Sequence, residues 1–270
     1  MMSFFRAIGT LIREIYNDRS LLIAFSMKDF KRRFAGSFFG MAWAFIQPLL
    51  TMIIYWIVFQ FGFRSGDVGH IPFILWFMCG IIPWLFISEA FSIASNSFLE
   101  YSYLVKKVMF NINILPLVKI LSSLIIHLFF IGLLIFVCVL FGYYPQVYSV
   151  QVIYYMFCTM AFVFAISLIC SSIMVFFRDL NQIIGLILLA GMWGTPIAWN
   201  PNIFPESVQF YIKLNPIFYL VEGYRDCFVS NRWFWDKYNQ TAYFWIVTLI
   251  LFFIGTFLYN RLKPHFADVL

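Results

Sequence analysis

The sequence contains five apolar stretches that are each long enough to cross a lipid bilayer as a helix. A transmembrane helix needs roughly 20 consecutive apolar residues. The stretches of this length are Met41–Phe61, Ile71–Ala94, Leu117–Phe141, Val150–Phe177 and Thr241–Tyr259, and a sixth, Ile183–Trp199, is shorter. None of them shows the alternation with a period of two that is typical of membrane barrel strands. We therefore predict an all-α integral membrane protein with six transmembrane helices.

Composition and charge are also those of a membrane protein. Hydrophobic residues make up 63% of the chain and charged residues only 11%, whereas soluble proteins average roughly 25% charged residues. Lys and Arg concentrate in alternate connecting segments, at positions 6–33, 106–107, 178 and 261–263. Because positively charged loops stay in the cytoplasm, we predict a multi-pass plasma membrane protein with both termini cytoplasmic. The net charge of +6 then suits membrane lipids as partners, and we expect no nucleic acid.

Residues 1–35 are expected to form a cytoplasmic interface segment. Apolar side chains between Phe4 and Tyr16 recur at helical spacing on one face. Such an amphipathic helix lies in the plane of the inner leaflet, and a soluble helix packed on the domain is the alternative. Charged residues interrupt the apolar core that a cleaved signal peptide needs. The expected layout is a single transmembrane domain over residues 1–270, with the six-helix part over 36–263.

The segment Gly194–Gln240 matches neither a transmembrane span nor an ordinary loop. It is rich in aromatic residues, and Pro196, Pro201, Pro205 and Pro216 divide it. Non-helical backbone survives at membrane depth only where protein or a water-filled cavity satisfies its polar groups. We therefore predict that the chain moves something across the bilayer, with residues 200–238 on the outer side of the route.

Aromatic residues along the whole chain fit two purposes. One set of Trp residues is expected near the outer interface, in a belt that contacts lipid headgroups. This set is Trp56, Trp76, Trp199, Trp233, Trp235 and Trp245. Other rings are suited to line a route for sugars, because ring faces stack on the apolar faces of sugars.

The chain carries no recognisable centre for chemistry of its own. It lacks the phosphate-binding motif G-x-x-x-x-G-K-[ST], so ATP and Mg²⁺ are expected on a partner ATPase and no cofactor on this chain. His, Cys and carboxylate residues show no metal-ligand spacing, so we predict neither a metal site nor catalytic residues. Two ionisable residues are noted inside spans. Glu89 lies near a cytoplasmic helix end, and His127 is expected to be a hydrogen-bonded packing residue.

Other function classes make demands that the sequence does not meet. An ion-coupled transporter carries ionisable residues at mid-membrane, and a membrane-embedded glycosyl- or acyltransferase groups carboxylates or a His at one membrane face. The inner-side acids Glu89, Glu100 and Asp179 show no such grouping. A scaffold that transports nothing leaves the broken segment before the last span unexplained.

Two cytoplasmic connections are candidates for contact with a partner. Residues 96–116 carry apolar side chains around Lys106 and Lys107. This pattern fits either a short helix between two bends or a loop that only anchors the topology. Arg178–Asn181 is the whole turn before the next span, and a cation followed by an Asp that can cap the next helix already gives it a structural role.

Several segments resemble the permease subunits of ABC-2 type polysaccharide exporters. They are Lys31–Pro48, Phe177–Ile184, Thr195–Ile197 and Lys213–Phe228. Within this group the likeness is closest to the permeases that translocate wall teichoic acid in Gram-positive bacteria, on Pro83–Ala90, Ser97–Pro116 and Leu214–Arg225. The likeness extends from about Lys28 to Lys263, and the stretch LNPIFYLVEGYR is its most specific part.

The resemblance implies a homodimer of six-helix permeases bound to two copies of a separate ABC ATPase. That partner would move a coupling helix around Ser102–Asn113 and make a second contact at the turn Arg178–Asn181. The coupling residues implied are Tyr101, Ser102, Tyr103, Leu104, Lys106, Lys107, Phe110, Arg178 and Asp179.

The cargo implied by the resemblance is an undecaprenyl diphosphate-linked glycopolymer, flipped to the outer face for cell wall biogenesis. Wall teichoic acid is the expected polymer, and an O-antigen or capsular polysaccharide is the alternative. Cations at the entrance suit a phosphate-rich polymer, and the candidates are Lys28, Lys31, Arg32 and Arg33. The positive-inside rule predicts the same cluster.

The resemblance also implies that two short re-entrant helices within Pro201–Arg232 close the exit. The residues expected at this outer gate are Tyr219, Glu222, Tyr224 and Arg225. Glu222 and Arg225 are spaced i,i+3 and can pair on one helix face. Local helix stabilisation and a gate function explain this pair equally well.

Overall fold

A computed structural model of the chain describes residues 19–36, 38–105 and 112–269. Across these ranges the protein is helical and contains no strand, apart from one isolated bridge between Val68 and Ile71. The predicted amphipathic helix over Phe4–Tyr16 lies outside the described residues. The same holds for Lys106, Lys107 and Phe110.

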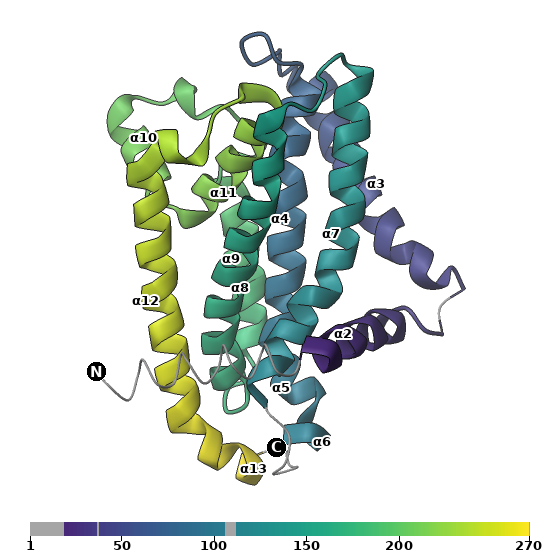
Figure 1. Cartoon of the computed structure of the whole chain (residues 1–270), viewed down its shortest axis with the longest axis vertical. Helices are drawn as coiled ribbons and strands as arrows, with labels where there is room; N and C mark the ends of the chain where they lie inside the picture. Colours follow the sequence, from purple (N-terminus) through teal and green to yellow (C-terminus); the bar gives the residue numbers. More distant parts are fainter. Residues whose placement is uncertain (1–18, 37, 106–111, 270) are drawn as a thin grey trace.

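Within the described ranges, five segments are long and apolar enough to span a membrane. Their cores are α3 (Trp43–Ile57), α4 (Phe73–Ser95), α7 (Leu115–Leu140), α8 (Val152–Met174) and α12 (Tyr238–Leu262). With their flanking short helices these segments cover Gly40–Gly62, Phe73–Ser95, Ile112–Leu140, Val147–Met174 and Phe234–His265. They correspond to the five long apolar stretches of the sequence (Figure 1).

The sixth apolar helix, α9, covers Leu180–Gly194 and is displaced from the predicted Ile183–Trp199. It ends earlier than expected because Pro196 disfavours helical backbone at the residue before it, and Thr195 is extended, with φ −104° and ψ 137°. Its 15 residues rise by about 22 Å, which is less than the roughly 30 Å of a bilayer core. The sixth helix is therefore shorter than a full span.

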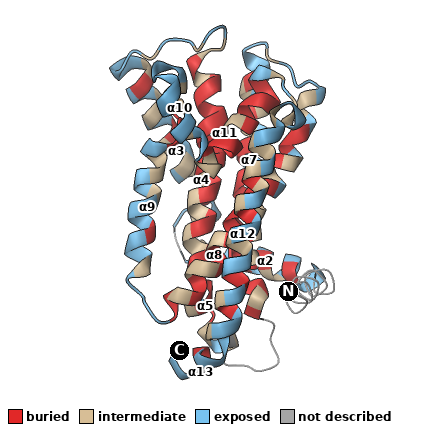
Figure 2. Cartoon of the chain, turned by 90° about the vertical axis from the view of Figure 1, so that its left-hand side faces the viewer, coloured by how far each residue is buried: buried red, intermediate tan, exposed pale blue. Residues whose placement is uncertain are grey.

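Helix α4 forms the centre of the bundle. It packs against α7, α8, α9, α11 and α3. Of its most apolar stretch of 18 residues, 78% is buried. The segments that contain α3 and α12 lie at the periphery, with 17% and 22% of the corresponding apolar stretches buried. Figure 2 shows the same contrast between the buried centre and the largely exposed α9.

The remaining elements gather at the two ends of the bundle (Figure 1). One end, here called the α2 end, carries α2 (Arg19–Arg33), α5 (Ser97–Glu100), α6 (Ser102–Val105), α13 (Phe266–Val269) and the turn before α9. The opposite α11 end carries the loops after α3 and α7, with α10 (Glu206–Lys213) and α11 (Pro216–Arg225). Segments that the charge pattern predicts on one side of the membrane thus share one end of the molecule.

Two short helices precede the last span, as expected, but they differ in position. Helix α10 has no buried residue. Helix α11 is mostly buried and packs among α4, α8 and α12. It continues into a π-helical turn that ends at Asn231, whose φ of 52° is left-handed. Only α11 is therefore inserted into the bundle.

Close packing of α11 depends on Gly223. A Cβ atom at this position would lie 2.0 Å from Cε1 of Tyr155 on α8, and Tyr155 is itself fully buried. Glycine lets the backbone of α11 lie directly on the tyrosine ring, at some cost in helix propensity. The ring and the glycine together fix the depth of α11 in the bundle.

Gly223→Ala is expected to destabilise the protein, because overpacking in a filled core costs about 1–3 kcal/mol. The matched control is Gly132→Ala on α7, where an added Cβ meets nothing within 4 Å and the change should be neutral or slightly stabilising. Thermal unfolding of both purified variants checks this expectation. Equal melting temperatures would contradict the proposed packing.

Candidate functional site

A network of charges joins α2 to α5 and α7. Nζ of Lys119 lies 2.6 Å from Oδ1 of Asp29 and 2.7 Å from Oε2 of Glu100. The Tyr101 hydroxyl donates to the same Asp29 oxygen. The side chains of Lys119 and Asp29 are 1% and 0% exposed. One lysine therefore holds α2 and the end of α5 against α7.

The pKa of Asp29 reflects this environment. Burial by itself raises the pKa, but the hydrogen bonds from Lys119 and Tyr101 together with the charge of Lys119 lower it, and the net pKa is below the ordinary 3.8. Burial and contact with Asp29 raise the pKa of Tyr101 well above its usual range. Because the carboxyl pKa is lowered by folding, the pair stabilises the protein at neutral pH. This contribution is lost only as pH falls through the lowered value.

The four cations predicted at a substrate entrance separate into two groups. Arg32 pairs with Glu100, and Arg33 pairs with Glu89 on α4. Lys28 and Lys31 are exposed on α2. Both arginines are therefore neutralised by carboxylates within the chain, and Arg33 also lines a cavity.

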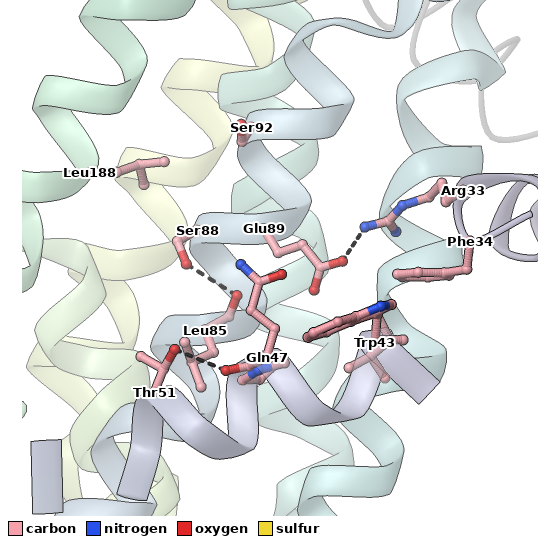
Figure 3. A pocket seen from close by; sticks show the side chains of 13 residues that line it. Arg33, Phe34, Trp43, Gln47, Thr51, Leu85, Ser88, Glu89, Ser92 and Leu188 are labelled. Atoms are coloured by element: carbon pink, nitrogen blue, oxygen red, sulfur yellow. Dashed lines mark hydrogen bonds and ion pairs between the residues drawn. The ribbon is translucent and has the colours of Figure 1, made fainter. Parts of the chain in front are cut away.

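That cavity is a pocket of about 400 Å³ between the end of α2, α3 and α4, with contributions from α7 and α9. Its polar lining consists of Arg33, Gln47, Thr51, Ser88, Glu89 and Ser92. Figure 3 shows the Arg33–Glu89 pair above Trp43, with Gln47 reaching toward Ser88 and Glu89. The pocket thus combines one neutral ion pair, uncharged polar groups and an aromatic ring.

The two predicted coupling elements lie side by side at the α2 end. Asn96 Nδ2, at the start of the coupling loop, donates to Asn181 Oδ1 in the turn before α9 at 2.9 Å. Arg178 and Asp179 in this turn are exposed. Asp179 occupies the N-cap position of α9 but makes no side-chain capping bond, so the predicted cap is absent.

The coupling residues on the described part of the loop differ in exposure. Tyr103 is 52% exposed, and Ser102 and Leu104 are half-buried. Tyr101 is buried and bound to Asp29. The described residues cover the two ends of the predicted coupling helix around Ser102–Asn113: α6 at its start and a separate 3-10 turn, Ile112–Ile114, at its end, while residues 106–111 lie outside them. Tyr101 thus binds the loop to α2 through Asp29, while the side chain of Tyr103 is exposed on the surface of the loop.

At the α11 end, Arg225 is buried and binds four neighbours. Its Nη1 donates to Glu222 at 2.6 Å, and its Nη2 donates to the carbonyls of Pro196 and Ile197 at 2.7 and 3.0 Å. The guanidinium carbon lies 3.5 Å from the centroid of the Trp76 ring. A buried arginine is stable only when its donors are satisfied in this way.

These contacts hold together two segments that resemble the ABC-2 permeases, Thr195–Ile197 and Lys213–Phe228. Gly80 on α4 leaves space for the arginine, because a Cβ there would lie 2.9 Å from Arg225 Nη2. Asn215 caps α11 by accepting from Ile217 N, and donates through Nδ2 to Thr195 Oγ1 at 2.9 Å. The segment after α9 is therefore fixed to both ends of α11.

The other predicted gate residues belong to buried polar contacts. The Tyr219 hydroxyl lies 3.1 Å from that of Tyr154 and 3.0 Å from Thr241 Oγ1. The Tyr224 hydroxyl lies 2.7 Å from Nε2 of His127, and the His127 ring stacks on Phe86. The expectation that His127 is a hydrogen-bonded packing residue is confirmed.

The prediction that Trp76 belongs to the aromatic belt is wrong. Trp76 is only 5% exposed and lies beneath Arg225, so it is a core residue rather than an interfacial one. Its position on the central helix α4 determines this burial, and a hydropathy pattern does not show which face of a span meets protein.

The structure also adds residues that the sequence reasoning missed. Lys119 lies within the predicted span Leu117–Phe141, where an ionisable side chain requires a partner. Asp29 is the only acid on α2, and an acid in an otherwise basic helix could have indicated that it pairs with Lys119. Gln47 and Trp43 carry no such signal, because only the fold brings α3 beside Glu89.

Comparison with known proteins identifies the family. The sequence profile of the ABC-2 type transporter family matches residues 20–229. The chain therefore belongs to the ABC-2 type transporter family and is a membrane-embedded transporter component.

Curated relatives are similar over most of their length. The chain is 27% identical to an O-antigen export system permease protein RfbA of Klebsiella pneumoniae over 253 residues, which covers 93% of this chain and 95% of the relative. It is 28% identical to the protein of the same name from Myxococcus xanthus, over 82% of this chain and 85% of the relative. The match thus extends beyond isolated motifs to nearly the whole domain.

Lys119→Met is expected to lower the free energy of unfolding by about 3–5 kcal/mol, because it leaves Asp29 buried without a cation. Adding Asp29→Asn should recover part of this loss. Lys28→Met, exposed on the same helix as Asp29, is the control and should change stability by less than about 0.5 kcal/mol. Unfolding of the purified proteins in detergent gives the three values. A double variant no more stable than Lys119→Met would argue against a coupled pair.

Proposed function

We propose that this chain is the permease subunit of an ATP-driven ABC exporter for a lipid diphosphate-linked cell-surface polysaccharide. The family match over residues 20–229 carries this proposal, together with relatives of nearly equal length that are named as O-antigen export permeases. The chain lacks a phosphate-binding loop motif. ATP hydrolysis is accordingly assigned to a separate ATPase subunit.

In this proposal the α2 end faces the cytoplasm and binds the ATPase. The positive charge of the connecting segments at this end supports that orientation. Exposed Tyr103, Arg178 and Asp179 offer a contact surface, and the bond between Asn96 and Asn181 lets both contacts move as one unit. Glu100 then passes a movement of the loop to α2 through Arg32 and to α7 through Lys119.

Two copies of the chain are proposed to enclose the route. Helices α3 and α9 expose large apolar side chains over most of their surface, and Ile184 is the only buried residue of α9. Such faces pack against lipid or against a second copy in a membrane. The pocket is lined by several residues of α3 and by Leu188 of α9, so a homodimer formed along these helices would place two pockets beside one central route.

The favoured cargo is an O-antigen-type polysaccharide. The expectation of wall teichoic acid finds no support in the names of the relatives, whereas the O-antigen alternative does. The charges of the pocket agree with this preference, because its one cation, Arg33, is paired with its one carboxylate, Glu89, and is not free for a phosphate-rich chain. Teichoic acid remains the second candidate because of the segments that resemble its permeases.

Affinity purification of the chain from its native membrane is expected to recover an ABC ATPase and a lipid-linked glycan. Compositional analysis of that glycan separates the candidates: sugar without phosphate in the repeat supports an O-antigen, and one phosphate per repeat supports teichoic acid. Depletion of the chain should cause the same lipid-linked glycan to accumulate inside the cell. Recovery without an ATPase, under conditions that preserve other membrane complexes, would reject the proposal.

Glu222→Ala and Arg225→Ala are expected to impair export while binding of the ATPase survives. The reason is that this pair fixes α11 and the segment after α9 at the proposed exit, far from the α2 end. Glu206→Ala on exposed α10 is the matched acidic control and should export normally. Cell-surface glycan and co-purified ATPase are measured for each variant. Unchanged export in both pair variants would exclude a gate function.

A further inference from the structure

The pocket at the end of α2 has almost no electrostatic preference for an anion. Arg33 is its one cation and Glu89 its one carboxylate, and the two form an ion pair. A phosphate that bound Arg33 would have to break this pair and leave Glu89, only 25% exposed, facing the incoming charge. Like charges at such short range repel strongly in a site with little water.

The uncharged polar groups of the pocket are available to a ligand. Ser88 and Thr51 donate their hydroxyl hydrogens to the carbonyls of Leu85 and Gln47, so their oxygens remain free to accept. The Gln47 amide makes no hydrogen bond within the part of the chain that the structure describes, and it reaches into the pocket (Figure 3). An amide offers donors and acceptors together, which matches a sugar hydroxyl.

An aromatic ring forms one wall. Trp43 is 41% exposed and lies below the Arg33–Glu89 pair in Figure 3. Its face is apolar while its edge carries an N–H donor, a combination that suits the C–H face of a sugar ring. The volume of about 400 Å³ lies within the roughly 300–1,000 Å³ of small-ligand sites.

We propose that this pocket is a saccharide subsite, in which an uncharged sugar unit stacks on Trp43 and accepts hydrogen bonds from Gln47 and the paired Arg33. Glu89 and Ser88 accept from the sugar hydroxyls. The site therefore binds the sugar part of the lipid-linked glycan and not its diphosphate group. This inference rests on the proposed function, because it assigns the polysaccharide to one place on the permease.

The position of Arg33 gives the subsite a link to the partner-binding end. The neighbouring Arg32 binds Glu100 at the start of the coupling loop, and Asp29 one turn earlier is fixed by Lys119. A displacement of α5 moves α2, and α2 carries Arg33 at its last residue. Binding of the sugar and the state of the coupling loop are thereby connected through one helix.

The test measures binding to the full chain in lipid nanodiscs, without ATP. The first probe is the neutral oligosaccharide released by mild acid from the lipid-linked glycan of the native cells, and the second is geranyl diphosphate, which carries no sugar. Trp43→Ala and Gln47→Ala are expected to weaken oligosaccharide binding about tenfold, the effect of losing one good contact. Trp43→Phe, which keeps a ring, should lose less than about threefold.

The controls separate the subsite from a general effect. Trp235→Ala, an exposed tryptophan at the α11 end, should bind like the wild type, and the melting temperature of each variant shows that it is folded. Unchanged oligosaccharide binding in folded Trp43→Ala and Gln47→Ala overturns the inference. Competition by geranyl diphosphate at the same site also overturns it, because the pocket would then be a phosphate site. A chain that co-purifies with its ATPase but binds no oligosaccharide refutes this subsite and leaves the proposed function standing.

Discussion

Every charge buried in this chain has to find its partner inside the protein, because a bilayer supplies none. Lys119 meets this demand at the α2 end with Asp29 and Glu100. Arg225 meets it at the α11 end with Glu222 and two carbonyls after α9. Both cations join elements that are distant in sequence, so the same contacts that make the charges tolerable also hold the ends of the bundle together.

Helix α4 connects these two ends. It carries Glu89, the partner of Arg33, near the α2 end, and Trp76, the ring under Arg225, near the α11 end. The peripheral helices α3 and α9 are held by fewer buried contacts. In the proposed transporter the buried centre transmits a movement from the predicted coupling loop, while the exposed faces of α3 and α9 are left to contact lipid, a second copy or the cargo.

Much of the architecture could be predicted from the sequence, since apolar runs of span length and the positions of Lys and Arg are local signals. The limits of α9 were wrong because Pro196 ends the helix before the apolar run ends. The pairing of Glu222 with Arg225 was accessible from their spacing, but the burial of Arg225 was not, because its other partners come from α4 and the segment after α9. The pocket was out of reach for the same reason: Trp43, Gln47 and Glu89 meet only in the folded chain.

Transport by the reconstituted complex tests the central claim most directly. The chain and its co-purified ATPase are placed in liposomes with a lipid-linked glycan that carries an oxidisable label, and a membrane-impermeant oxidant reports the leaflet in which the glycan resides. The account predicts that ATP moves the glycan to the opposite leaflet and that an ATPase unable to hydrolyse ATP abolishes the movement. Equal movement with and without ATP, or none with an active ATPase bound, would contradict it.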